Sequence, residues 1–188
     1  MKKKLKNYRS DILRFIRKNF FSLYKGIIIF GGYIKFFNKI NRKKKNIKFS
    51  SNLDNINNYE YQITSQNNED GIINYIFNQL KIDKLNFIEI GFDYYQNNSL
   101  AILKKCNKGL FIDGDNKKVI ILRNVLKLFY PKTKINVQNA LVDIDNINQI
   151  KEQNFNDKEE IDFLSIDVDG IDYYLLKEIN FKPKLICI

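Results

Sequence analysis

The chain of 188 residues contains no histidine and no tryptophan, and it has only two cysteines and two prolines. Without histidine it can form neither a Ser-His or Cys-His catalytic pair nor a metal site with imidazole ligands. Cys106 and Cys187 lie in apolar stretches and form no CxxC pair, so we expect both to be reduced and buried in a cytoplasmic protein.

Long apolar runs are also absent from the N-terminal part. The longest charge-free run there, Gly26 to Ile34, has nine residues, whereas a membrane-spanning helix needs about 20. Lys35 follows directly, and no small-residue cleavage site is present. The pattern therefore favours a cytoplasmic protein over a secreted or membrane-spanning one.

Charge divides the chain into two parts. Residues 1–50 hold 16 Lys and Arg and one acid, whereas residues 51–188 hold 16 Lys and Arg and 20 acids. Apolar residues from Ile12 to Tyr24 recur at helical spacing among basic ones. We therefore predict a basic amphipathic arm over residues 1–50 and a domain over residues 51–188. The arm suits peripheral contact with an anionic membrane at the inner surface, or packing on the domain or a partner; nucleic-acid binding is not favoured, because no reader motif is present.

Beyond residue 58 the pattern alternates between strands and helices. The predicted strands are Asn86 to Ile90, Leu110 to Ile112, Ile135 to Leu141, Ile161 to Ile166 and Leu185 to Ile188. The predicted helices carry the apolar stripes within 72–80, 98–106, 119–129, 147–150 and 174–179. This alternation is typical of an α/β protein with a Rossmann-like parallel sheet covered by helices on both faces. The chain stops within its last apolar strand, so we expect a truncated domain that is either marginally stable or pairs with another copy through that strand.

Acidic residues end three of these strands. Glu89, Asp113 and Asp167 each follow an apolar run, and the carboxyl ends of parallel strands meet in one crevice where such folds bind ligands. Asp167 and Asp169 are the candidate catalytic residues, since a strand-end carboxylate can orient an acceptor or take its proton. Other acids have simpler roles: Asp115, Asp143, Asp145 and Asp172 fit helix N-termini.

Several segments together resemble one family. These segments are similar, in the same order, to FkbM-like methyltransferase domains of bacteria. They are Ser65 to Ile73, Phe87 to Gly91, Gly109 to Asp113, Leu164 to Tyr173 and the strand from Lys182. Two departures are that Tyr94 stands where the family has Gly, and that the family's Ser-Asn pair appears as Asn98-Ser99.

The resemblance implies a class I fold with sheet order 3-2-1-4-5-7-6, of which this chain supplies strands 1 to 5. It implies S-adenosylmethionine as cofactor and O-methylation of a sugar, a glycan or another small acceptor. The cofactor residues expected on this basis are Glu89 for the methionine ammonium, Gly91 and Asp93 in the loop, Asp113 for the ribose, and Ala140 and Leu141 beside the adenine.

Two alternatives remain open at this point. Asp167-Val168-Asp169 also resembles the DxD motif of metal-dependent glycosyltransferases, in which the acids hold a divalent ion on a sugar diphosphate. The second alternative is a degenerate domain without a cofactor. The methyltransferase interpretation gives Glu89 and Gly91 a role that the glycosyltransferase interpretation does not, and it requires no metal.

Overall fold

The computed structural model describes residues 12, 14–16, 26–27, 30–32, 34 and 55–188. Most of the predicted basic arm, and its boundary with the domain at residue 51, lie outside these described residues. None of the helices in the described ranges is long and apolar enough to cross a membrane.

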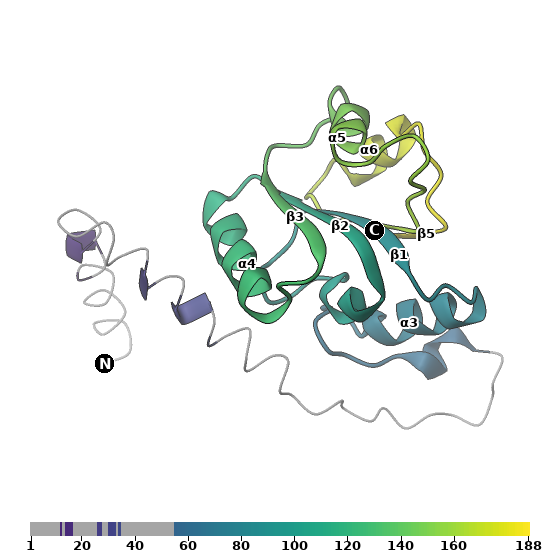
Figure 1. Cartoon of the computed structure of the whole chain (residues 1–188), viewed down its shortest axis with the longest axis horizontal. Coiled ribbons are helices and arrows are strands. Elements are labelled where there is room, and N and C mark those ends of the chain that lie inside the picture. The colour runs from purple at the N-terminus through teal and green to yellow at the C-terminus, as the bar shows by residue number, and fades with distance from the viewer. Residues whose placement is uncertain (1–11, 13, 17–25, 28–29, 33, 35–54) are drawn as a thin grey trace.

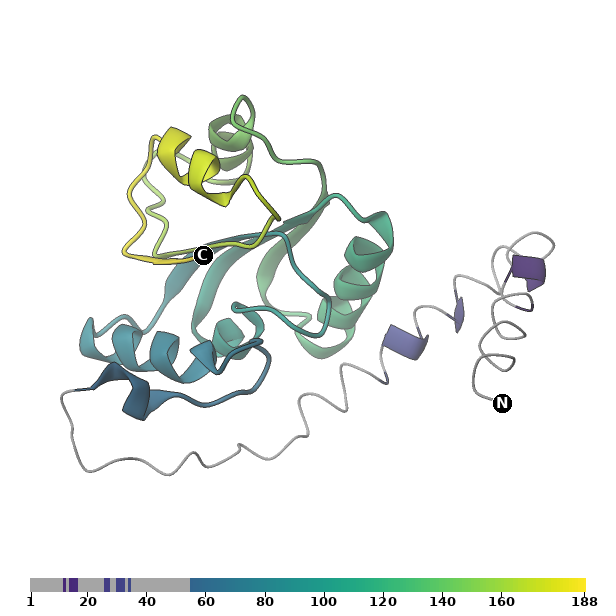
Figure 2. The ribbon, with the colours of Figure 1, turned by 180° about the vertical axis from the view of Figure 1, so that it is seen from behind.

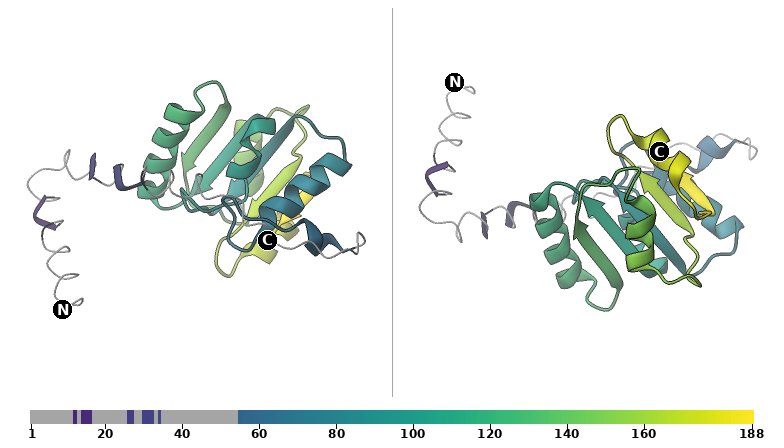
Figure 3. Two further views of the ribbon diagram at one scale, coloured as in Figure 1. Left: turned by 90° about the horizontal axis from the view of Figure 1, so that it is seen from below. Right: turned by 90° about the horizontal axis from the view of Figure 1, so that it is seen from above.

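The domain is built on one parallel sheet of five strands (Figures 1 and 3). The strands are β1 (Leu85–Ile90), β2 (Cys106–Asp113), β3 (Lys134–Asn139), β4 (Phe163–Ile166) and β5 (Leu185–Cys187). Their order across the sheet is β3-β2-β1-β4-β5, and every pairing is parallel. The predicted α/β class and the predicted order of the first five strands are both confirmed. β5 is an edge strand, as expected.

Helices cover both faces of the sheet (Figure 2). The 3₁₀ helix η1 (Ile56–Tyr59) comes first in the chain. The first hydrophobic cluster contains residues of three helices: α3 (Glu69–Gln79), the 3₁₀ helix η2 (Leu100–Lys105) and α4 (Asn116–Phe129). The second cluster includes residues of α5 (Ile147–Asn154) and α6 (Asp172–Glu178). Burial on both faces explains why the central strands β1 and β4 are mostly apolar along their whole length.

The period of two along a strand assigns each side chain to a face. In β1, Phe87 belongs to the first cluster, whereas Ile88 and Ile90 belong to the second. Glu89 has the same parity as Phe87, so its side chain lies on the face covered by α3 and η2. The same rule places Ser165 of β4 and Cys187 of β5 on that face.

Some predicted boundaries were wrong. The stretch from 98 to 106 was predicted to be one helix; it is a short 3₁₀ helix, and Cys106 already begins β2. The Asn97 side chain does accept a hydrogen bond from the Leu100 N–H (3.0 Å), as a capping residue would. The third strand ends at Asn139, so Ala140 and Leu141 lie in the following loop. Both cysteines are half-buried rather than fully buried, and no disulfide joins them.

A buried carboxylate organises the segment that leads into α3. Asp70 is fully buried, and its Oδ2 accepts hydrogen bonds from the backbone N–H groups of Ile63, Thr64 (2.7 Å) and Ser65 (2.9 Å). The adjacent Gly71 has no room for a side chain, because a Cβ there would lie 1.9 Å from the Tyr59 carbonyl oxygen. The Ser65 to Gly71 motif is therefore a folding element that holds residues 61–71 against the end of the sheet.

Candidate functional site

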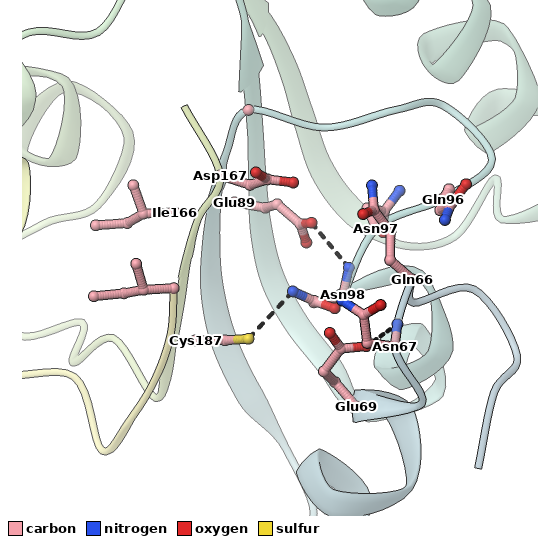
Figure 4. Close-up of a pocket in the computed structure, with 12 residues that line it drawn as sticks. Gln66, Asn67, Glu69, Glu89, Gln96, Asn97, Asn98, Ile166, Asp167 and Cys187 are labelled. Carbon is pink, nitrogen blue, oxygen red and sulfur yellow. Dashed lines mark hydrogen bonds between the residues drawn. The ribbon is translucent and has the colours of Figure 1, made fainter. Parts of the chain in front are cut away.

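Three side chains lie in one row across the sheet near its carboxyl edge. Glu89 of β1 is in register with Ser165 of β4, and Ser165 is in register with Cys187 of β5. Asn98 spans this row. Its N–H donates to Glu89 Oε1 (2.9 Å) and its Nδ2 to Cys187 Sγ (3.3 Å), as Figure 4 shows. Its Nδ2 also donates to Ser165 Oγ (3.1 Å). One loop residue thus ties three strands together.

Glu89 is the most unusual group of the row. Its side chain is only 1% exposed, and its Oε2 accepts no hydrogen bond from any described residue. Burial raises the pKa of Glu89 from 4.5 to about 7, while the nearby Ser99 hydroxyl and the Asn98 N–H oppose that rise. A buried carboxylate with an unsatisfied oxygen is costly. The arrangement therefore indicates a group that a bound cation or hydrogen-bond donor would stabilise.

A pocket of about 150 Å³ opens beside this carboxylate, and we call it the Glu89 pocket. Figure 4 shows the carboxylates of Glu89 and Asp167 pointing into the same space, with the amides of Asn97 and Asn98 opposite. Its lining includes three acids and several amides but no Lys or Arg: Gln66, Asn67, Glu69, Glu89, Gln96, Asn97, Asn98 and Asp167 are its polar members. The composition favours a ligand group that is positively charged or rich in hydrogen-bond donors.

A second pocket, of about 360 Å³, lies on the other side of the β1 end, and we call it the Asp113 pocket. Asp113 ends β2, and its carboxylate is held by the N–H groups of Phe92 (3.1 Å) and Asp115 (2.6 Å) and by Lys118 Nζ (3.2 Å). Ala140 and Leu141 line the same pocket, and Leu141 is 80% exposed. The structure thus places the residues expected for the ribose and the adenine together.

Gly91 and Asp167 line both pockets and so mark the point where the two meet. Gly91 has φ +73°, and a Cβ there would lie 1.9 Å from the Asp167 carbonyl oxygen. The close approach of the β1 and β4 ends therefore requires glycine at position 91, whether or not a cofactor binds. Asp167 is exposed, and its pKa is raised first by partial burial and then by the charges of Asp172 and Asp169.

The remaining predicted acids divide between site and scaffold. Asp169 lines the Asp113 pocket together with Asp167. Asp115 caps α4 through the Lys117 N–H (2.8 Å), as predicted. Asp172 stands in the first turn of α6 and accepts a hydrogen bond from the Val168 N–H (2.7 Å), which fits its predicted helix-terminal role. Asp143 accepts from the N–H groups of Asp145 and Asn146, just before α5.

Asp93 is the one predicted cofactor residue that lines neither pocket. Its backbone pairs with that of Gln96 in a tight turn, and the loop lines the Glu89 pocket again from Gln96 onward. Tyr94 packs against the first hydrophobic cluster and contacts the Tyr95 ring at 5.0 Å between centroids. The tyrosine that replaces the expected glycine therefore serves packing and lines neither pocket.

Sequence reasoning assigned no ligand role to several residues of the Glu89 pocket, namely Gln66, Asn67, Glu69, Asn98 and Cys187. Gln66 to Glu69 belong to a motif used only to mark the family resemblance, and their position beside the β1 end is a tertiary feature. The side chain of Asn98 bridges two strands through Ser165 and Cys187, which lie far from it along the chain.

Within the described ranges, no group of three or more Cys, Asp and Glu side chains is arranged to hold a metal ion. No protein-family model matches the chain, and no curated protein matches it either.

Proposed function

We propose that this protein is an S-adenosylmethionine-dependent methyltransferase that acts on a hydroxyl group of a sugar or another small acceptor. The observation that carries the proposal is the unpartnered Oε2 of buried Glu89, a residue that lines a pocket joined to the Asp113 pocket at Gly91 and Asp167. An elongated ligand could place an ammonium group beside Glu89 and a ribose beside Asp113.

The residues present fit that cofactor group by group. Glu89 Oε2 receives the ammonium, and the amides of Gln66, Asn67 and Gln96 at the same pocket can donate to the carboxylate next to it. Asp113 receives the ribose hydroxyls through lone pairs that its three existing hydrogen bonds leave free. Ala140 and Leu141 give the adenine an apolar contact. When bound, the cofactor supplies a methyl group on a positively charged sulfur.

Asp167 stands where the acceptor and the reactive end of the cofactor meet, at the junction of the two pockets. It would accept the proton of the acceptor hydroxyl while the bound cofactor supplied the methyl group. Partial burial and the charges of Asp172 and Asp169 raise the pKa of Asp167, which makes it a better proton acceptor. Asp169, on the same strand-to-helix turn, contacts the acceptor.

Exposed aromatic rings beside this turn suit a sugar acceptor. Tyr173 and Tyr174 at the start of α6 are 68% and 59% exposed. Tyrosine rings offer flat apolar faces on which sugar rings stack. The rival metal-dependent glycosyltransferase would use Asp167 and Asp169 to hold a divalent ion on a sugar diphosphate, and it gives Glu89 and Gly91 no role.

Calorimetric titration of the full chain tests the proposal. S-adenosylmethionine should bind one site, whereas a UDP-sugar with manganese should not. Asp113→Ala should weaken S-adenosylmethionine binding by about 1–3 kcal/mol, because it removes charge-assisted hydrogen bonds to the ribose. Glu152→Gln on the outer surface of α5 is the matched control and should bind as the native chain does. Binding of the UDP-sugar alone would favour the glycosyltransferase, and binding of neither ligand would favour a non-catalytic domain.

A further inference from the structure

A helical segment N-terminal to the sheet packs against the domain through a glycine. Residues 26–27, 30–32 and 34 are helical, and Figures 1 and 3 show them on the α4 side of the domain. Gly32 is buried, and a Cβ added to it would clash with the side chain of Ile121 in α4. The backbone at Gly32 therefore lies directly against α4, which fixes the side of the segment that faces the domain.

The opposite side of the segment is apolar and exposed. Ile27, Phe30 and Ile34 are 39%, 65% and 48% exposed, and we call these three residues the Phe30 face. At about 100° per helical residue they lie within about 60° of one another, whereas Gly32 lies at least about 140° from each. Single apolar residues on a surface are ordinary, but three on one helix face form a patch that is better removed from water.

Positive charge gathers around this patch. Residues 1–50 hold 16 Lys and Arg and one acid, and the charge-free run from 26 to 34 has a lysine on either side in the sequence. The helix that Gly32 contacts is also basic: α4 contains four Lys and Arg and no acid, and Lys117, Arg123 and Lys127 on it are exposed. The Phe30 face therefore adjoins a basic surface of a domain in which acids otherwise outnumber bases.

From this combination we propose that the Phe30 face docks on the surface of an anionic lipid bilayer. Its three apolar side chains insert at the level of the headgroups, and the exposed basic residues of α4 face the lipid phosphates. An apolar helix face among basic residues is the pattern that binds such surfaces. The charge-free run of nine residues is too short to span a bilayer, which takes about 20, so the segment lies along the surface.

The charge balance favours lipid over a protein as the occupant of the Phe30 face. A protein surface of mixed charge would leave most of the 16 basic residues of the arm without a counter-charge, whereas an anionic membrane supplies one continuously. The proposal goes beyond the enzymatic function and does not depend on it.

Co-sedimentation of the full chain with vesicles tests the proposal. Two compositions are compared, phosphatidylcholine alone and phosphatidylcholine with about 30% phosphatidylserine. The chain should bind the anionic vesicles at least about tenfold more tightly than the neutral ones, because each basic residue near the surface adds to the attraction. Raising the salt concentration should reduce that ratio, since exposed charges are screened.

The variant Phe30→Ser tests the apolar contact. It should weaken binding to the anionic vesicles at least about fivefold, because the inserted ring is removed from water only in the bound state. The matched control is Leu80→Ser directly after α3, where the native side chain is 50% exposed, and it should bind as the native chain does.

The variant Lys127→Glu tests the basic surface of α4. Reversing this exposed charge should weaken binding to the anionic vesicles about fivefold and leave binding to the neutral ones unchanged. The matched control is Lys177→Glu on α6, an exposed lysine on the other face of the sheet, which should retain most of the native affinity.

Three results would overturn the proposal. The first is a native chain that does not bind the anionic vesicles, and the second is a Phe30→Ser variant that binds them as tightly as the native chain. The third is a native dimer, seen by size-exclusion chromatography with light scattering, that Phe30→Ser converts to a monomer, because it would assign the Phe30 face to a second copy of the chain. Equal weakening by Lys127→Glu and Lys177→Glu would overturn the role of α4 in the contact.

Discussion

Two buried carboxylates near the same edge of the sheet are partnered in opposite ways. Asp70 accepts hydrogen bonds from three successive backbone N–H groups, whereas Glu89 accepts one N–H on Oε1 and leaves Oε2 unbonded among the described residues. Burial raises the pKa of both, to about 7 in Glu89, while in Asp70 the backbone hydrogen bonds oppose the rise. A satisfied buried acid stabilises a loop; an unsatisfied one at a pocket indicates a binding role.

The largest effect on stability is expected from removing Asp70, the buried acid whose carboxylate is fully hydrogen-bonded. Asp70→Ala leaves three backbone donors of residues 63–65 without their acceptor, at about 1–3 kcal/mol for each buried group that finds no water. We expect the free energy of unfolding, measured by urea denaturation, to fall by about 4 kcal/mol. The exposed Asp83→Ala should change it by less than about 0.5 kcal/mol. A loss below about 1 kcal/mol in Asp70→Ala would contradict the structural role.

Two glycines at the strand ends beside the Glu89 pocket, Gly91 and Gly170, differ in the space around them. A Cβ at Gly91 would lie 1.9 Å from the Asp167 carbonyl oxygen, whereas one at Gly170, also at positive φ, would meet nothing within 4 Å. Gly91→Ala should therefore cost at least about 3 kcal/mol of unfolding free energy, and Gly170→Ala only about 1 kcal/mol, the price of its strained φ. Equal losses in the two variants would show that the close approach at Gly91 is not the cause.

Neutralising the unsatisfied acid should have the opposite effect to neutralising a satisfied one. The rise of the Glu89 pKa from 4.5 to about 7 corresponds to roughly 3 kcal/mol. Because the folded-state pKa is raised, the proton's contribution to stability is full below about pH 4.5 and lost as the pH rises through 7.

Glu89→Gln should thus leave stability unchanged at pH 4 and raise it by about 2 kcal/mol at pH 8, part of the gain being offset by the unpartnered amide N–H. Urea denaturation at the two pH values measures this. The same variant should bind S-adenosylmethionine more weakly than the native chain does. A variant that is less stable at pH 8 and binds normally would show that Glu89 is a structural acid like Asp70.

The smallest expected effect is the pH dependence of binding. If the ammonium of the ligand requires ionised Glu89, whose pKa is about 7, the affinity should rise about fivefold between pH 6 and pH 7. Calorimetry at the two pH values gives the ratio, and Glu89→Gln serves as the control whose residual binding should not depend on pH in this range. A native chain with equal affinity at both pH values would separate the ligand from this carboxylate.

Much of the fold was predictable because its signals are local. Each buried strand is an apolar run, and Glu89, Asp113 and Asp167 each stand at the end of one, which was enough to predict one crevice. The structure of the segment from 98 to 106 was not predictable, because the spacing of Leu100, Ile102 and Leu103 suits both an α-helix and a 3₁₀ helix. The bridging role of Asn98 and the full satisfaction of Asp70 depend on contacts between distant or folded-back segments, which a single sequence does not reveal.

The row formed by Glu89, Ser165 and Cys187 depends on the register of the three strands and on which face each side chain occupies. Side chains alternate between the two faces, so deleting a single residue from β1 ahead of Glu89 would turn the carboxylate toward α5 and α6 and bring an aliphatic side chain beneath Asn98. A point substitution changes one side chain of this site, whereas an insertion or deletion inside a strand moves every following side chain of that strand to the other face. The loops at the carboxyl ends, where chain length is free to vary, are the places at which new specificity can be engineered without losing the acid.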